Sequence, residues 1–193
     1  MQTSSSFFST IKRIAEFFLP DSRQQALLVY GELHKQARAT WFYEQANVPD
    51  TIDGRFELLV LHVFLWINRM KQEDNYEQAY QPITKQLLEV LFDDLDSALR
   101  EMGVGDTGVP RRIKAMAEAL YGRMDAYETA LESKEAVYKA LRRNIYAEHG
   151  NDSDINLLQL YLGYIADHLA QRPAERLSEG TLMMPEPAEL MAE

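Results

Sequence analysis

The sequence predicts an all-α fold, a single-domain helical bundle of about six to seven helices. Apolar residues recur at helical spacing through most of the chain, whereas the alternating runs typical of strands are nearly absent. Glycine and proline gather in short blocks between the helical stretches. With 193 residues, 46% of them apolar, the chain is long enough to bury a core. We therefore expect an N-terminal amphipathic helix over residues 1–20, a helical domain over 21–172 and a flexible C-terminal tail over 173–193.

The first 20 residues are rich in phenylalanine and predict an amphipathic helix. Lys12 and Arg13 lie inside the apolar stretch, whereas the basic residues of a secretory signal precede it. One interpretation is a helix that docks on its own domain or on a second copy of the chain. The other is a helix that lies in the headgroup region of a membrane surface. The apolar face consists of Phe7, Phe8, Ile11, Ile14, Ala15, Phe17 and Phe18.

The first helices of the domain are delimited by the residues that break them. Pro20 precedes a helix expected over about residues 22–39, and three aromatic residues at 41–43 close it or start a short extra turn. The turn at residues 50–54 is followed by a helix over about 55–71. This helix is apolar on all sides, which indicates a buried position at the centre of the bundle.

The next two helices are separated by a glycine-rich turn. Pro82 suits a first-turn position, and the helix that it starts reaches Glu101. Gly103 ends this helix, because glycine tolerates left-handed backbone geometry. Pro110 opens the following helix, and Gly122 in its middle is expected to permit the close approach of another helix.

Two capped helices complete the domain. Ser133 is expected to cap a helix that continues through Tyr146, and Asp154 one that continues through Leu169. Beyond Pro173 the helical periodicity is lost, which is why we expect a flexible tail there.

Composition and charge exclude several classes of function. The chain has no cysteine, so disulfides, thiolate chemistry and cysteine-based zinc sites are excluded. Its formal net charge of −10 argues against direct binding of nucleic acid, because neutralising phosphates requires a basic surface. The longest apolar run, residues 58–67, is about half of the ~20 residues that span a bilayer. We expect no transmembrane helix, no metal and no cofactor.

The glycine spacing of a dinucleotide-binding motif is present without its context. Gly103, Gly105 and Gly108 match the spacing, but no strand precedes them, and Asp106 would repel a phosphate. Neither a nucleophile elbow nor the Glu-x-x-His pairs of a di-iron bundle are found. The sequence therefore predicts a protein that is not an enzyme.

An acidic run on the fourth expected helix leaves one ligand-binding alternative open. Asp93, Asp94 and Asp96 are similar to the magnesium-binding acids of isoprenoid synthases, and Glu89 lies one turn before them. A magnesium-dependent binder of prenyl diphosphates is the corresponding function. Asp96 is also spaced to form an ion pair with Arg100 on the same helix.

His62 lies inside the apolar run of the expected central helix. A neutral imidazole there can bond to a backbone carbonyl or to a buried carboxylate. We therefore predict that His62 is largely buried and hydrogen-bonded to protein, without a metal.

Two short, charged blocks separate the helices that surround the expected centre of the bundle. Aspartates beside glycines can cap the following helix and accept bidentate bonds from arginine. We expect Arg55 and Asp106 to belong to one charge network that joins the two blocks. The blocks are Val48-Pro-Asp-Thr-Ile-Asp-Gly-Arg-Phe56 and Gly103-Val-Gly-Asp-Thr-Gly-Val-Pro-Arg-Arg112. Their expected partners are the acids Asp50, Asp53 and Asp106 and the bases Arg55, Arg100, Arg111 and Arg112.

Three longer segments contain these blocks and occur in a set order. They are residues 48–65, residues 92–110 and residues 116–123, and Asn144-Ile-Tyr146 forms a fourth, shorter motif. Together they closely resemble the ubiquinol–cytochrome c chaperone family over residues 30–146. The resemblance implies that the motif residues form a structural charge network. Its members are Asp50, Asp53, Arg55, His62, Asp96, Arg100, Asp106, Arg111, Arg112 and Arg123.

The resemblance also implies a function and partners. The chain would be an assembly factor for the cytochrome bc1 complex that holds newly made cytochrome b. A small helical partner and the ribosome exit region are further expected contacts, and a homo-oligomer is compatible with this role. The short N-terminus favours a bacterial, cytoplasmic protein that reaches the inner membrane through its N-terminal helix. A eukaryotic member would lie in the mitochondrial matrix.

Three consecutive aromatic residues are the expected client-binding surface. Trp41, Phe42 and Tyr43 cannot all face one helical core, so we predict that at least one is accessible to solvent. We expect it beside a groove, within reach of Arg111, Arg112 or the N-terminal helix. The alternative is that the helix ends at Thr40 and the three rings are buried in different directions. A general interaction module or homodimer in membrane-protein assembly is the alternative function.

Overall fold

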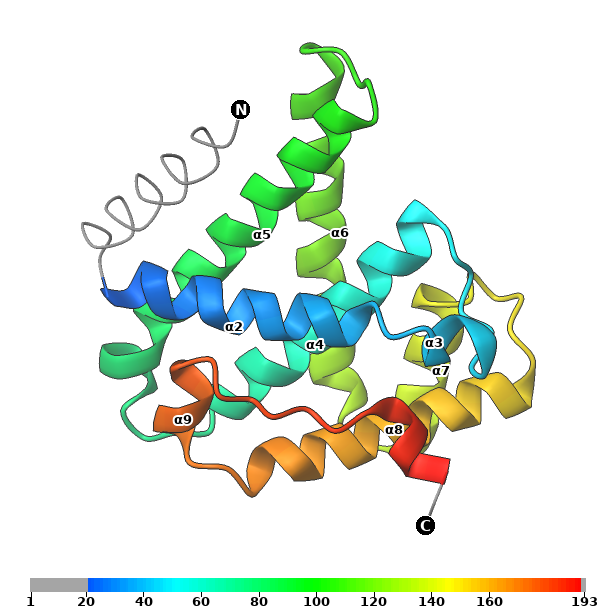
Figure 1. The fold of residues 1–193 in the computed structure, drawn as a ribbon. Coiled ribbons are helices and arrows are strands. Elements are labelled where there is room, and N and C mark those ends of the chain that lie inside the picture. The colour runs from blue at the N-terminus through cyan, green and yellow to red at the C-terminus, as the bar shows by residue number, and fades with distance from the viewer. Residues whose placement is uncertain (1–20, 192–193) are drawn as a thin grey trace, which may run out of the picture.

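The computed structural model describes residues 21–191, and the N-terminal amphipathic helix predicted over residues 1–20 lies outside this range. All regular structure in the described range is helical, so the predicted all-α class is confirmed. The six long helices predicted for the domain are present, and the π-helix η1 and three short helices are added to them. In chain order the elements are α2 (Asp21–Ala37), α3 (Trp41–Glu44), α4 (Ile52–Met70), η1 (Tyr76–Tyr80), α5 (Gln81–Glu101), α6 (Gly108–Ala130), α7 (Lys134–Asn144), α8 (Asp152–Ala170), α9 (Ala174–Ser178) and the 3-10 helix η2 (Pro187–Met191) (Figure 1).

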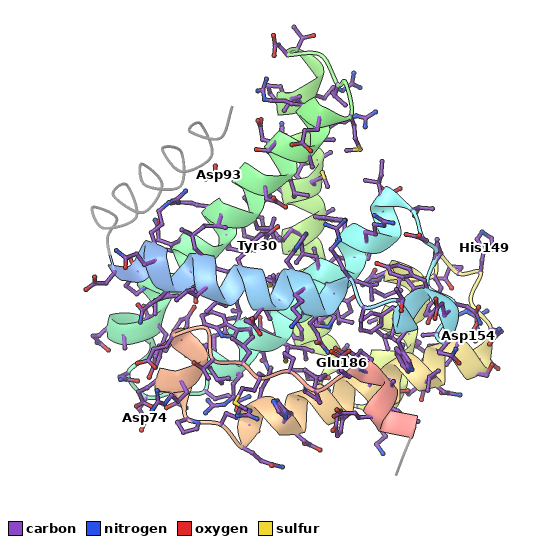
Figure 2. The ribbon with its side chains drawn as sticks, in the orientation of Figure 1. Tyr30, Asp74, Asp93, His149, Asp154 and Glu186 are labelled. Carbon is purple, nitrogen blue, oxygen red and sulfur yellow. The ribbon has the colours of Figure 1, made fainter. Side chains whose placement is uncertain are left out.

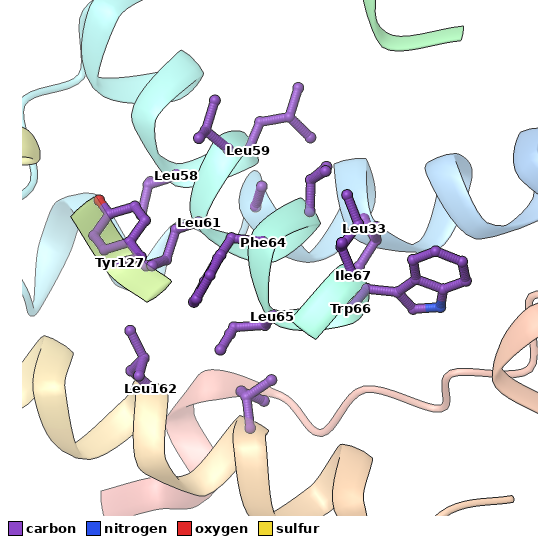
Figure 3. Close-up of a cluster of buried hydrophobic side chains, with 14 of the residues drawn as sticks. Leu33, Leu58, Leu59, Leu61, Phe64, Leu65, Trp66, Ile67, Tyr127 and Leu162 are labelled. Carbon is purple, nitrogen blue, oxygen red and sulfur yellow. The ribbon is translucent and has the colours of Figure 1, made fainter. Parts of the chain in front are cut away.

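The helix α4 lies at the centre of the fold, as its apolar sequence predicts. Of its 19 residues, 14 are buried, and they project in every direction around the helix axis. Figure 3 shows Leu33 of α2, Tyr127 of α6 and Leu162 of α8 on different sides of α4. Neighbouring helices therefore cover α4 on several sides and remove its apolar surface from water.

The first block forms the start of α4. This helix begins three residues earlier than expected, because the Thr51 hydroxyl accepts a hydrogen bond from the Gly54 backbone N–H at 3.1 Å and caps it. A Cβ atom at Gly54 would lie 2.0 Å from the Pro49 carbonyl oxygen, so only glycine fits there. The capped turn explains the order of threonine and glycine in the block.

The second block forms the tight connection between α5 and α6, at the top of Figure 1. Gly103 has a φ of +80°, and its N–H bonds to the Arg100 carbonyl at 2.9 Å. The Val104 N–H bonds to the Leu99 carbonyl at 3.0 Å, which completes the double-bonded helix end expected of a glycine. The expectation for Gly122 is wrong, since no atom outside its own helix lies within 4 Å of a Cβ placed there.

The caps of α7 and α8 differ in how well the sequence predicts them. Ser133 caps α7 as expected, because its hydroxyl accepts a hydrogen bond from the Ala136 N–H at 3.1 Å. The cap of α8 is Asn151, whose side-chain oxygen accepts a hydrogen bond from the Asp154 N–H at 2.9 Å. Asp154 lies in the first turn instead, where it is buried and accepts a hydrogen bond from Asn47 at 3.1 Å (Figure 2).

The stretch after Pro173 corrects the prediction of a flexible tail. Residues 174–187, here called the C-terminal strap, run across the fold between α2 and α8 (Figure 1). Leu177 and Leu182 are fully buried, and the Leu177 carbonyl accepts a hydrogen bond from the Trp66 indole at 3.3 Å. The strap uses isolated apolar anchors rather than one continuous helical face. For this reason it carries no helical periodicity.

His62 is buried as predicted and belongs to a hydrogen-bond network that joins four parts of the fold. Its Nδ1 lies 2.7 Å from the Leu58 carbonyl, which can only accept, so Nδ1 carries the proton. Its Nε2 accepts a hydrogen bond from the Tyr161 hydroxyl of α8 at 2.6 Å. That hydroxyl accepts a hydrogen bond from Gln36 of α2, which also donates to the Pro185 carbonyl of the strap.

The assignment of His62 to a charge network is wrong. Burial lowers the pKa of His62 to about 4, so its imidazole is neutral near pH 7. Complete removal from water makes the charged form costly, and no carboxylate is among its hydrogen-bond partners in the described range. His62 therefore acts as a neutral hydrogen-bonding group that ties α4 to α8.

Replacing His62 with glutamine is expected to make the free energy of unfolding depend less on pH. The pKa of His62 is lowered from 6.5 to about 4 in the folded chain, so the unfolded chain binds more protons between these values. The stability from this residue is present above pH 6.5 and is lost as the pH falls towards 4. Between pH 7.5 and 5 the loss is about 2 kcal/mol. Urea unfolding at several pH values checks this, and equal slopes for both proteins would contradict it.

Replacing Leu177 with alanine tests whether the C-terminal strap contributes to stability. Because Leu177 is fully buried, the substitution should lower the free energy of unfolding by about 2–5 kcal/mol. The exposed Glu175, on the same short helix α9, is the matched control, and its alanine variant should change stability by less than about 0.5 kcal/mol. Thermal unfolding of the two variants distinguishes a packed strap from a loose one, for which neither change would matter.

Candidate functional site

Four segments that are distant in the sequence line one groove beside the start of α4, here called the α4–α6 groove. Its walls come from residues 49–57, from Leu99 of α5, from the face of α6 between residues 112 and 123, and from residues 143–147 after and within the end of α7. The volume is about 640 Å³, within the range of ~300–1,000 Å³ that is typical of binding sites. The groove therefore collects residues from each of the motifs singled out in the sequence.

An ion pair between α4 and α6 holds the two main walls of the groove together. The Arg123 Nε donates to one Glu57 oxygen at 2.9 Å, and its Nη2 donates to the other at 2.9 Å. Only 7% of Glu57 is exposed, and burial raises its pKa although Arg123 acts in the opposite direction. Glu57 in turn raises the pKa of Arg123 through their hydrogen bond. The bidentate geometry fixes the distance between the walls.

The rim of the groove carries two arginines without a carboxylate partner among the described residues. Arg112 lies in the first turn of α6, and Arg143 lies near the end of α7; both are exposed. The Arg143 Nε donates to the Asn144 side-chain oxygen at 3.1 Å. Asn144 lines the groove and is buried, and a hydrogen bond with Asn144 lowers the pKa of the Tyr127 phenol. The groove thus has two guanidinium groups that no carboxylate of the described fold neutralises.

Apolar side chains form much of the remaining lining. Phe56, Leu99 and Ile145 are buried below the surface, and Met116 is half-buried. Ile52 stands at the rim with 52% of its surface exposed. An exposed isoleucine beside a hollow lined with apolar groups is typical of a surface that contacts another molecule.

Comparison with known proteins places the chain in a family. A family model described as Ubiquinol-cytochrome C chaperone matches residues 44–184. The chain belongs to this family of cytochrome bc1 complex assembly factors. The match includes each segment that forms the α4–α6 groove. No helix within residues 21–191 is both long enough and apolar enough to cross a membrane.

Individual relatives agree with this assignment. Ubiquinol-cytochrome-c reductase complex assembly factor 1 of Xenopus laevis is 25% identical over 125 residues, which is 64% of this chain and 60% of that protein. The corresponding factor of Mus musculus is 23% identical over 141 residues, which is 72% of this chain and 46% of that protein. The chain therefore spans about half the length of these curated relatives. The crystal structure of the Cbp3 homolog from Brucella abortus matches with a TM-score of 0.75 and 33% identity, over 95% of this chain and 98% of that one.

The predicted charge network between the two blocks is wrong in its connections. Arg55 bonds to Asp50 at 2.6 Å within the first block, whereas Arg100 bonds to Asp96 at 2.6 Å and to Asp106 at 2.7 Å. No ion pair within the described range joins Arg55 to Asp106. Partners five or six residues apart are close along the chain, so each arginine is paired locally at little cost in chain entropy.

The remaining members of the predicted network have different surroundings. Asp53 and Arg112 line the α4–α6 groove, and Arg123 holds its walls together. Arg111 is exposed next to Arg112 but does not line the groove. Glu57 was not predicted as the partner of Arg123, because Glu57 lies within the apolar pattern of α4. The one available signal was an acid on a helix whose apolar character indicated burial on every side.

The aromatic triplet is mostly part of the core, as the alternative interpretation of the sequence predicted, and its role in client binding stays a prediction. Trp41 is 6% exposed and Phe42 is fully buried, and both rings contact the Tyr161 ring at centroid distances of 5.8 and 4.9 Å. Tyr43 is half-buried and bonds to the Ala37 carbonyl at 3.4 Å. The helix α3 is a single turn between two bends, so consecutive rings can be buried in different directions. None of the three lines the α4–α6 groove.

The acidic run on α5 connects this helix to its neighbours. Arg23 of α2 donates to Asp93 at 2.8 Å, and the Tyr30 hydroxyl of α2 donates to Asp94 at 2.8 Å (Figure 2). Arg100 forms an ion pair with Asp96. Each carboxylate therefore has its own protein donor, and within the described range no three potential ligands lie close enough to hold a metal ion. The arrangement supports a structural role, in which Asp93 and Asp94 hold α5 against α2, rather than the magnesium site of a prenyl-diphosphate binder.

Replacing Arg123 with methionine should destabilise the chain by about 3 kcal/mol, because the buried Glu57 carboxylate loses its counter-charge. Replacing Glu57 with leucine as well removes the uncompensated charge, so the double variant should recover most of the loss. Urea unfolding of the two single variants and the double variant measures the coupling. Strictly additive losses would show that the two side chains do not act as a pair.

Proposed function

We propose that the chain is a non-enzymatic chaperone that binds newly made cytochrome b during assembly of the cytochrome bc1 complex, and that the α4–α6 groove is the binding surface. The family assignment supports the assembly role. The observation that carries the location is the convergence of the family-like motifs on one groove with an exposed apolar rim. The resemblance adds cytochrome b as the client.

The chemistry of the groove suits binding better than catalysis. Its one buried acid, Glu57, is held by Arg123 through two parallel hydrogen bonds. The buried imidazole of His62 is occupied on both nitrogens, and His62 does not line the groove. A general base takes a proton from a substrate within its reach; both Glu57 oxygens are already bonded to Arg123, and His62 lies outside the groove.

The apolar lining suits a client that belongs in a membrane. A newly made membrane protein exposes apolar segments, which an open groove can cover until assembly. Met116 has a flexible, polarisable side chain that adapts to differently shaped apolar groups. The proposal also includes a place of action at the inner-membrane surface, where such a client is inserted.

Replacing Ile52 with aspartate should weaken crosslinking to cytochrome b roughly tenfold in the native cell, because a charge replaces an apolar contact at the rim. The same change at Leu160 is the matched control, since this residue is 64% exposed on α8 and lies outside the groove. Both variants should keep the thermal stability of the unmodified chain. The content of assembled bc1 complex is the second measurement, and it should fall only with the Ile52 variant.

Two results would count against this function. If deletion of the gene leaves the bc1 complex at its normal level, the chain does not act in its assembly. If the Ile52 and Leu160 variants crosslink to cytochrome b equally well, the client binds outside the α4–α6 groove.

A further inference from the structure

Two arginines that line the groove have no carboxylate partner within residues 21–191, although the chain is acidic. The sequence holds 30 acidic and 20 basic residues, so carboxylates are in excess. Seven of the twelve arginines of residues 21–191 are paired with a carboxylate. The pairs are Arg23 with Glu89 and Asp93, Arg55 with Asp50, Arg69 with Glu73, Arg100 with Asp96 and Asp106, Arg123 with Glu57, Arg142 with Glu148 and Asp152, and Arg176 with Glu179.

Five arginines of residues 21–191 have no carboxylate partner among the described residues, namely Arg38, Arg111, Arg112, Arg143 and Arg172. Two of them, Arg112 and Arg143, line the α4–α6 groove. They approach it from different elements, since Arg112 lies at the start of α6 and Arg143 near the end of α7. In an acidic chain, two unpaired guanidinium groups around one apolar hollow favour a negatively charged group on the molecule that fills it.

Asn144 adds a polar group to the lining of the groove. Arg143 can only donate, so the Asn144 atom that it contacts must be the oxygen, which identifies the other atom as the Nδ2 amide. Asn144 is only 6% exposed, and a hydrogen bond with Asn144 lowers the pKa of the buried Tyr127 phenol. The buried amide and the buried hydroxyl therefore serve each other, and the charge of the groove depends on Arg112 and Arg143.

The charge of the groove distinguishes between possible anions. Asp53 and Glu57 line it together with the arginines, so the local field is not uniformly positive. A phosphate carries up to two negative charges, so these acids repel it more strongly than a carboxylate, which carries one. The apolar residues Phe56, Met116 and Ile145 also match the side chains of a peptide.

We infer that the α4–α6 groove binds a peptide segment of a partner protein in which a glutamate or aspartate lies among apolar residues, and that Arg112 and Arg143 bind its carboxylate. This inference rests on the proposed function, because it takes the groove to be the client surface. The arginines give the groove selectivity: apolar contacts retain many segments, and the ionic contact favours those that carry an acid.

Binding of overlapping 15-residue peptides that cover the cytochrome b sequence tests the inference, with each acidic peptide also made in a form where glutamine or asparagine replaces the acid. Fluorescence anisotropy with the full chain measures affinity at low and high salt. The acidic apolar peptides should bind up to about fivefold more tightly than their neutral forms, as expected for an ion pair with exposed arginines. That difference should shrink at high salt, because the arginines are exposed.

The double variant Arg112→Gln/Arg143→Gln should bind the acidic and the neutral peptides equally weakly. Arg111→Gln is the matched control, since Arg111 is also exposed and also lacks a carboxylate partner among the described residues, but lies outside the groove. It should retain the preference for the acidic form. Thermal unfolding should give the same midpoint for all three proteins, because each changed side chain is exposed.

Three outcomes would overturn the inference. The first is an equal affinity for acidic and neutral peptides, with binding still lost in the Ile52→Asp variant; this leaves the proposed function intact. The second is the absence of binding by every peptide, in which case cellular crosslinking still decides the proposed function separately. The third is stronger binding of phosphatidylglycerol vesicles than of any peptide through Arg112 and Arg143, which would make a lipid surface the occupant.

Discussion

The apolar surface of α4 is the constraint on which the other helices depend. A helix that is apolar on every side gains stability only when neighbours cover each side, and α2, α6, α8 and the C-terminal strap contribute to that cover. The few polar groups on α4 then need internal partners, because water does not reach them. Glu57 is neutralised by Arg123 of α6, and His62 is bonded by Tyr161 of α8. The apolar helix thus determines which polar contacts join the fold.

The same constraint positions the groove. Near its start, α4 lines the α4–α6 groove together with α6 and the end of α7. The Glu57–Arg123 pair joins the two main walls of the groove, while Ile52 and the two unpaired arginines lie at the rim. The ion pair keeps the shape of the groove constant. The exposed rim, which is part apolar and part charged, is free to contact a partner. This division of roles connects the packing of the core with the proposed binding of a client.

Features encoded in neighbouring residues could be predicted from the sequence, whereas those that join distant residues could not. The end of α5 at Gly103 and the cap of α7 at Ser133 depend on a few adjacent residues, and both were predicted. Arg123 could be selected from its motif, but its partner lies 66 positions away and was missed. The strap was missed because its anchors are spaced irregularly. The burial of the aromatic triplet could not be decided from the sequence, because helical periodicity says nothing about a one-turn helix between two bends.

The strengths of the two kinds of ion pair fit the proposed task of a chaperone. Glu57 and Arg123 are largely shielded from water, so separating them is costly and the groove keeps its form. Arg112 and Arg143 are exposed, where an ion pair contributes only about 0–1 kcal/mol. A carboxylate bound by these two arginines would therefore add selectivity without making the complex hard to dissociate. An assembly factor must release its client to the complex being built. A weak ionic contact beside a fixed apolar lining permits that release.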